Sequence, residues 1–262
     1  CHSIIYIIQL LKYSPSYVSY ESMDGNKNAS KPPIIIMHGL FGSKTNWNLL
    51  SKTIHRDTDR KVITVDARNH GDSPHSSDMT YSHMAQDIVQ LMNDLGFQKS
   101  ILIGHSMGGS TMMYVALNYP QLVEKLIIVD MSPVRVSPQL MEMEKIFKAM
   151  RTVNLEGIAT LTKARTSIRD QLANAIKSLP LRQQNFASQI AVFPDVGSKV
   201  YNGPTLFIGG SNSDYIRVED HNKIKKLFPS AGFTYINGAN HWVHADKPTE
   251  FLKITIDFVN QT

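Results

Sequence analysis

Short apolar runs recur along the chain with little polar alternation inside them. Continuous runs of this kind are typical of strands that are covered by helices on both faces. They predict strands over 17–22, 33–38, 61–66, 101–105, 125–130, 204–209 and 232–237. Longer segments between them place apolar residues at helical spacing and predict helices over 46–55, 80–95, 107–119, 217–228 and 248–259. Regular alternation of strands and helices predicts an α/β fold with a mostly parallel, doubly wound sheet.

Residues 134–200 interrupt this alternation, because they contain helical patterns but no convincing strand pattern. The clearest of these patterns is an amphipathic helix over 139–151, suited either to core packing or to an apolar ligand wall. We therefore expect a helical cap inserted between the strands 125–130 and 204–209, which are the sixth and seventh core strands when a first strand within residues 3–11 is counted. The chain then divides into a core over 1–133, a cap over 134–200 and a second core part over 201–262.

Composition narrows the possible functions. The chain has 262 residues and 42 % hydrophobic residues, enough for a substantial core, and a formal net charge of +5. Its basic residues are scattered, with no run longer than Lys225-Lys226, which argues against a nucleic-acid binder and leaves peripheral membrane contact open. Cys1 is the only cysteine, so no intrachain disulfide can form. Residues 3–11 are apolar but too short to span a bilayer, so we expect a first strand or an irregular arm there, with the tail of a targeting segment as the alternative.

A serine stands between glycines at the end of the predicted strand 101–105. Gly104, Ser106 and Gly108 form the pattern G-x-S-x-G, with a strand pattern before it and a helical pattern after it. In a nucleophile elbow of this kind, a sharp turn exposes the serine hydroxyl near a helix N-terminus, and small residues are needed because strand and helix pack closely. The sequence therefore predicts Ser106 as a nucleophile, with an incidental serine in a tight turn as the alternative.

A nucleophilic serine that attacks a carbonyl needs donors for the developing oxyanion. The N–H of Met107, directly after Ser106, is the first candidate. The stretch "MHGLFGS" over 37–43 follows a predicted strand, and there the N–H of Leu40 or of Phe41 is the second. An ordinary glycine-rich loop is the alternative interpretation of that stretch.

The base is expected to be a histidine late in the chain, since triads on this fold run in the order serine, acid, histidine. His241 lies after the last predicted strand and before the last predicted helix, and His244 is its rival. His38, His70 and His105 fall near the same sheet edge, and we expect them to hold loops through hydrogen bonds.

Two carboxylates compete for the third position of the triad. Asp130 ends the strand 125–130, and Asp214 follows the next strand, so both face the expected edge. Asp66 precedes the serine and breaks the chain order, and we expect it to pin the loop 66–73 together with Arg68.

Six stretches, taken together, resemble the α/β-hydrolase superfamily, in particular the abhydrolase domain-containing protein 11 group and its bacterial esterase relatives. They are "HGLFGSKTNW", "VDARNHGDSPHS", "GHSMGG", "VDMSPV", "GPTLFIGG" and "NHWVHADKP". The resemblance implies a serine hydrolase acting on carboxylic esters, typically mitochondrial, with lipid esters as substrates. It also favours Asp130 over Asp214, because relatives carry a non-acidic residue at the position of Asp214.

The chain departs from the family inside the expected cap. Relatives carry a further segment after the equivalent of residues 179–183, whereas this chain continues directly into 184–194. The resemblance therefore implies a shortened cap, and it leaves open an acid supplied by the missing part.

Two classes of function remain. The first is a serine esterase or lipase-like hydrolase that needs no metal and no organic cofactor and takes a small, lipid-like ester. The second is a non-catalytic binding or partner-stabilising module on the same fold, because fold alone does not prove function. Thioester cleavage and acyl transfer share the acyl-enzyme with the first, and the sequence does not separate them from it. Protein partners stay unknown.

Overall fold

The fold is described from a computed structural model of the chain. The described residues are 4–8, 15–21, 31–136, 190 and 192–261, with scattered positions between 152 and 171. The chain divides into two compact units, residues 1–135 with 193–262, and residues 136–192. The predicted helix over 139–151 and the departure from the family at 183–184 lie outside the described residues. The assignment of 134–200 as a cap stays a prediction.

Within the smaller unit, the described positions include two reciprocal hydrogen bonds between Asn154 and Gln171. The backbone N–H of Asn154 donates to Gln171 Oε1 at 2.8 Å, and Gln171 Nε2 donates to the Asn154 carbonyl at 2.9 Å.

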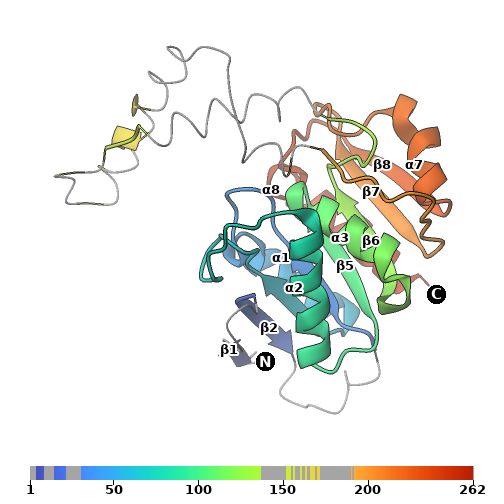
Figure 1. The fold of residues 1–262 in the computed structure, drawn as a ribbon, viewed down its shortest axis with the longest axis horizontal. Coiled ribbons are helices and arrows are strands. Elements are labelled where there is room, and N and C mark those ends of the chain that lie inside the picture. Colours follow the sequence, from blue (N-terminus) through green and yellow to red (C-terminus); the bar gives the residue numbers. More distant parts are fainter. Residues whose placement is uncertain are drawn as a thin grey trace. The chain divides into compact units, whose positions relative to one another are not determined.

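The larger unit is built on one eight-stranded sheet with the order β1-β2-β4-β3-β5-β6-β7-β8 (Figure 1). Its strands are β1 (Ile4–Ile8), β2 (Tyr17–Glu21), β3 (Ile34–Met37), β4 (Val62–Val65), β5 (Ser100–His105), β6 (Val123–Val129), β7 (Thr205–Gly210) and β8 (Ala231–Ile236). β2 is antiparallel to β1 and β4, and all other neighbours are parallel. The predicted mostly parallel sheet is therefore confirmed, and residues 4–8 form a first strand.

Helices cover both faces of this sheet, which explains why the strand sequences are continuously apolar. α2 (Tyr81–Asp94) and α3 (Met107–Asn118) pack together and lie in front of the sheet in Figure 1. α1 (Asn48–Thr58) and α9 (Pro248–Asn260) pack against each other. Ile34, Ile35 and Ile36 of β3 are consequently all fully buried. Burial on both faces is the condition under which a strand loses polar alternation.

The remaining elements are short, and two of them differ from the predicted pattern. The segment 217–228 forms the 3₁₀ turn η3 (Val218–Asp220) followed by α7 (His221–Leu227), so its α-helix is shorter than predicted. α8 (Val243–Asp246) was not predicted, because a single helical turn leaves no periodic pattern. Two further 3₁₀ turns are η1 (Lys44–Trp47) and η2 (Pro120–Leu122).

The carboxyl ends of the central parallel strands lie at one edge of the sheet. Met37 of β3 is in register with Gly104 of β5, and His105 is in register with Val129 of β6. Val129 is in turn in register with Ile208 of β7. Residues that follow these strands therefore meet at this edge, where ligands bind in open α/β sheets.

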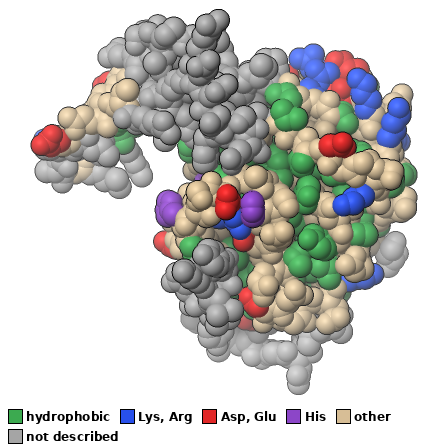
Figure 2. All heavy atoms as spheres, viewed as in Figure 1, with side chains coloured by type: hydrophobic (Ala, Val, Ile, Leu, Met, Phe, Trp, Pro, Cys, Tyr) green, Lys and Arg blue, Asp and Glu red, His purple; other side chains and the backbone are tan. Residues whose placement is uncertain are grey.

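Charged side chains do not form a large basic patch among the described residues of the face shown in Figure 2. Lys and Arg side chains gather over α7, where Lys223, Lys225 and Lys226 are exposed, and otherwise lie apart. That distribution agrees with the small net charge of +5. In the described part of the chain, every helix is too short or too polar to cross a membrane.

Thr80, the residue directly before α2, provides a test of the predicted helix start. Thr80 Oγ1 accepts the backbone N–H of His83 at 3.3 Å, as an N-cap does. Thr80→Ala should lower the free energy of unfolding by about 1 kcal/mol, because the N–H loses its acceptor. Thr80→Ser keeps the acceptor and should stay close to the wild type in urea denaturation. Equal losses for both variants would show that the cap does not stabilise α2.

Candidate active site

Ser106 occupies a sharp turn between β5 and α3. Its backbone angles are φ 53° and ψ −118°, a region that a non-glycine residue adopts only where the surrounding structure enforces it. The residue is buried, with 6 % of its surface exposed, and its N–H donates to the Val129 carbonyl at 3.0 Å. The turn thus places the hydroxyl at the N-cap of α3, beside helix N–H groups that have no intrahelical acceptor.

The glycines on either side of Ser106 make this turn possible. A Cβ at Gly104 would lie 2.3 Å from the Gly108 carbonyl oxygen, and a Cβ at Gly108 would lie 2.5 Å from the Met37 carbonyl oxygen. Both distances are far below van der Waals contact, so backbone approaches backbone directly. The predicted need for small residues in the elbow therefore has a concrete steric cause.

Three of the residues singled out in the sequence come together in a hydrogen-bonded line. Ser106 Oγ lies 3.0 Å from His241 Nε2, and His241 Nδ1 lies 2.7 Å from Asp130 Oδ2. An ionised carboxylate only accepts, so Nδ1 carries the proton and Nε2 is left to accept the serine hydroxyl. This is the arrangement in which a histidine can remove a proton from a serine.

Asp130 is held in place by two further donors. Its side chain is 1 % exposed, and its backbone adopts a left-handed φ of 50° directly after β6. The Gly210 N–H donates to Oδ1 at 3.2 Å, and Ser213 Oγ donates to Oδ2 at 2.5 Å. The sequence interpretation missed Ser213. Its only signal there was a polar residue in the loop that follows β7, where Asp214 drew attention instead.

The alternative residues lie in different surroundings. The Asp214 carboxylate lies 3.9 Å from the Arg217 guanidinium, while the Nδ1 of His241 faces Asp130. His244 is buried and stacks on Trp47, with 4.3 Å between the ring centroids. Burial lowers the pKa of His244 to about 4. The structure therefore places His244 in the core rather than beside Ser106.

His241 is oriented by contacts on its ring and on its backbone. The Tyr215 ring stacks on its imidazole with 3.8 Å between centroids and 18° between the planes. The carbonyl of His241 accepts a hydrogen bond from His105 Nε2 at 2.9 Å. Burial, with smaller contributions from the neighbouring histidines, lowers the pKa of His105 well below its usual value, so this donor is a neutral imidazole. His105 thus fixes the loop that carries His241, the candidate base.

Two backbone N–H groups border the serine as predicted oxyanion donors. Met107 is the first residue of α3, so its N–H has no intrahelical acceptor. Gly39 packs so closely on the elbow that a Cβ there would lie 3.2 Å from Ser106 Cβ, which brings Leu40 beside the nucleophile. The N–H of Leu40 has no hydrogen-bond partner among the described residues. The N–H of Phe41 donates to His70 Nε2 at 3.2 Å.

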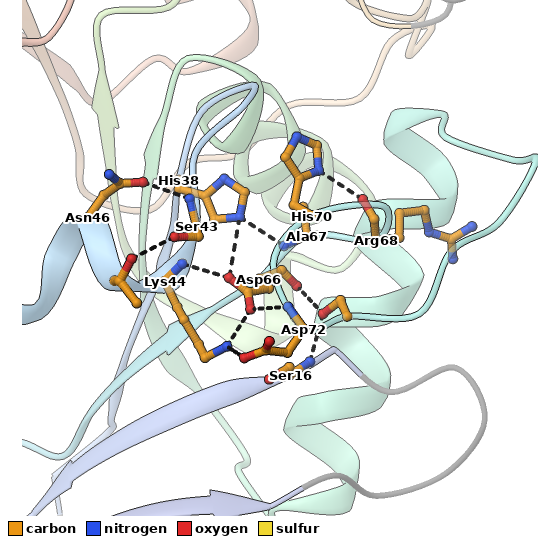
Figure 3. Close-up of polar contacts among 12 residues, drawn as sticks. Ser16, His38, Ser43, Lys44, Asn46, Asp66, Ala67, Arg68, His70 and Asp72 are labelled. Carbon is orange, nitrogen blue, oxygen red and sulfur yellow. Dashed lines mark hydrogen bonds and ion pairs between the residues drawn. The ribbon is translucent and has the colours of Figure 1, made fainter. Parts of the chain in front are cut away.

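Asp66 anchors the loop that follows β4, although not through the partner that the sequence suggested (Figure 3). Its side chain is fully buried and accepts the N–H of Asp72 at 2.9 Å and the N–H of Lys44 at 2.7 Å. The Lys44 ammonium pairs with both carboxylates, Asp66 and Asp72. Arg68 instead makes a two-pronged pair with Asp87, with both distances 2.7 Å. The expected pairing of Asp66 with Arg68 is therefore replaced by an Asp66–Lys44 pair, which ties the loop 66–73 to η1.

Metal-ligating side chains do not cluster in the described part of the chain. No group of three or more His, Cys, Asp or Glu side chains among these residues could hold a metal ion.

The chain is similar to several known proteins in sequence and in fold. Residues 32–155 match the sequence profile described as alpha/beta hydrolase fold. The chain is 40 % identical over 264 residues to the sn-1-specific diacylglycerol lipase ABHD11 of Xenopus tropicalis, covering 92 % of this chain and 82 % of that protein. The mouse protein of the same name is 39 % identical over 267 residues, covering 94 % of this chain and 86 % of that protein. A solved structure, a marine microorganism esterase, superposes with a TM-score of 0.77 at 30 % identity, covering 94 % of this chain and all of that one.

Substitution of the two candidate acids distinguishes their roles. Asp130→Asn should slow covalent reaction of Ser106 with a fluorophosphonate probe by about 10⁴-fold, because an amide in this position favours the wrong tautomer of His241. Asp214→Asn is the matched control and should react at the wild-type rate. The rates are read from time courses of labelling. A slow Asp214 variant beside a fast Asp130 variant would reverse the assignment.

Proposed function

The chain belongs to the α/β-hydrolase family, in the ABHD11 group, and is a carboxylic ester hydrolase; from this premise we propose that it cleaves lipid esters through an acyl-enzyme on Ser106. The alignment of Ser106, His241 and Asp130, with contacts of 3.0 and 2.7 Å, carries the proposal.

In the first half of the reaction, Ser106 Oγ attacks the ester carbonyl carbon while His241 Nε2 takes the hydroxyl proton. Asp130 offsets the positive charge that forms on the imidazole and keeps Nδ1 as the donor. The N–H groups of Leu40 and Met107 receive the negative carbonyl oxygen of the tetrahedral intermediate. His241 then passes the proton to the alcohol oxygen, the ester C–O bond breaks, and the acyl group stays on Ser106.

In the second half, water replaces the alcohol. His241 accepts a proton from the water as its oxygen attacks the acyl carbon, and the same two N–H groups hold the oxyanion again. The proton returns to Ser106 Oγ as the acid leaves. All steps use residues of the larger unit, and none requires a metal or an organic cofactor.

Apolar side chains beside the site support a lipid-like substrate. Phe41, next to Leu40, is 47 % exposed, and Trp242, next to His241, is 42 % exposed. Large apolar residues are costly to leave in water, so their position beside the oxyanion turn and the base suits contact with an acyl chain. The ABHD11 relatives are named for sn-1-specific diacylglycerol cleavage, and we extend that substrate class to this chain.

Two further parts of the proposal concern the surroundings of the protein. A mitochondrial location rests on the family resemblance, and a tagged protein expressed from its complete gene but absent from mitochondria would contradict it. Peripheral contact with an anionic membrane rests on the net charge of +5. Sedimentation with phosphatidylglycerol vesicles, compared with neutral vesicles, tests it.

Hydrolysis of a diacylglycerol that carries different acyl chains at its sn-1 and sn-2 positions tests the reaction directly. The wild type should release the sn-1 acid, and Ser106→Ala should lose at least about 10⁴-fold in rate, because the nucleophile is gone. Ser230 is exposed and donates to the Asn202 carbonyl, so Ser230→Ala is a matched serine control and should keep wild-type activity. Free acid and any new ester are quantified by mass spectrometry.

The outcomes separate the competing functions. Wild-type rates at the background of Ser106→Ala, on this substrate and on a short p-nitrophenyl ester, would overturn the proposal and favour a binding role. An ester product in place of free acid when an alcohol is added would assign acyl transfer instead.

A further inference from the structure

Two buried histidines exchange hydrogen bonds between the loop after β3 and the loop after β4. His38 belongs to the first loop, and its Nε2 accepts the N–H of Ala67 in the second at 3.1 Å (Figure 3). His70 belongs to the second loop, and its Nε2 accepts the N–H of Phe41 in the first at 3.2 Å. The centroids of the two rings lie 5.1 Å apart. The loops are therefore linked by a reciprocal histidine pair.

The other ring nitrogens define the protonation of this pair. His38 Nδ1 lies 2.7 Å from the Gly39 carbonyl, and His70 Nδ1 lies 3.0 Å from the Arg68 carbonyl. A carbonyl oxygen only accepts, so both rings carry their proton on Nδ1 and accept with Nε2. Both rings are therefore neutral. Burial lowers the pKa of both histidines, to about 4 for His38, in agreement with these tautomers.

The bond to His70 falls on a strained point of the oxyanion turn. The Gly42 N–H donates to the Gly39 carbonyl at 2.9 Å, which closes a turn around Leu40 and Phe41. Phe41 has a left-handed φ of 61°, unusual for a bulky aromatic residue. Such a conformation persists only where neighbouring groups enforce it. His70 supplies the acceptor that fixes the Leu40–Phe41 peptide in this orientation.

We propose that His70 is a positioning residue for ester cleavage, holding the Gly39–Gly42 turn so that the Leu40 N–H points at the oxyanion formed on Ser106. This inference rests on the proposed acyl-enzyme mechanism. His70 does not touch the substrate, and it acts through the Phe41 N–H alone. Misplacing an oxyanion donor by about 1 Å is enough to cost up to about 100-fold in rate.

Protonation of His70 would break this contact. An added proton on Nε2 would face the Phe41 N–H, so two donors would oppose each other and the turn would be released. The titratable groups that face His70 are His38, Asp66 and His75. The Asp66 carboxylate raises the pKa of His70 and His75 lowers it, but burial is the largest cause and the net direction is downward.

The lowered pKa of His70 determines how its contact with the Phe41 N–H responds to pH. The positioning contact is complete at pH values above the lowered pKa of His70 and is lost as the pH falls through it. Activity is also lost when His241 takes a proton, because a protonated base cannot accept from Ser106. The acid side of the wild-type rate profile should therefore contain two ionisations, and it should fall more steeply than one ionisation allows.

Two substitutions at His70 separate positioning from a merely structural role. His70→Phe keeps the ring volume and removes the acceptor, so kcat for a p-nitrophenyl ester should fall by about 10- to 100-fold with KM little changed. His70→Gln keeps an acceptor oxygen without a titratable group. It should retain most of the wild-type kcat, and the acid side of its profile should contain one ionisation. His55 is a matched control away from the site, since its Nδ1 donates to the Arg60 carbonyl, and His55→Phe should keep the wild-type kcat.

The results decide the proposal and the proposed function separately. Wild-type kcat in His70→Phe would overturn the positioning role, as would a His70→Gln variant that loses as much kcat as His70→Phe while melting at the wild-type temperature. If His70→Phe does not fold, the pH–rate profile of His70→Gln provides the test. A fall in kcat on the acid side as steep as that of the wild type would overturn the positioning role. Failure of the proposed function looks different, because the wild-type protein itself would then neither react with a fluorophosphonate nor hydrolyse the ester.

Discussion

The site depends on backbone packing so close that side chains are excluded where β5 turns into α3. Because Gly104 and Gly108 carry no Cβ, the first turn of α3 lies directly on the exit of β3. The parallel register of Met37 with Gly104 fixes this approach from inside the sheet. The distance between the exit of β3, where the oxyanion turn begins, and the elbow is therefore set by the core. A strained serine and a strained turn can persist there because the surroundings leave no alternative.

The histidines around this contact have two different chemical roles. His38, His70, His105 and His244 are buried, and burial lowers the pKa of each, so they serve as neutral donors, acceptors or stacking rings. His241 has 18 % of its side chain exposed and a carboxylate 2.7 Å from Nδ1. It alone combines access to the site with a counter-charge for an imidazolium ion. One histidine is thus equipped for proton transfer, whereas its buried neighbours serve as hydrogen-bonding or stacking groups.

The sequence predicted the sheet, the main helices and the elbow because each leaves a local pattern. Continuous apolar runs identify strands covered on both faces, and G-x-S-x-G identifies a turn whose sterics demand glycine. Asp130 and Asp214 could not be separated by such patterns, since each follows a strand at the same edge. Which one reaches His241 depends on the backbone angle after the strand and on the donors from Gly210 and Ser213. The positioning role of His70 was not predicted for a similar reason. Its partner Phe41 lies 29 positions away, and the contact is a single backbone N–H.

The acid of the candidate triad directly follows β6, five residues before Arg135, where the chain leaves the larger unit. Its own N–H bonds to the Ile208 carbonyl at 2.8 Å, and five residues later Arg135 pairs with Glu219 and Asp220. Together these contacts fix the chain just before it leaves the larger unit. Length changes in the segment that follows therefore leave the position of Asp130, the candidate acid, unchanged. A lineage could therefore shorten, extend or exchange that segment without rebuilding the hydrogen-bonded line of Ser106, His241 and Asp130.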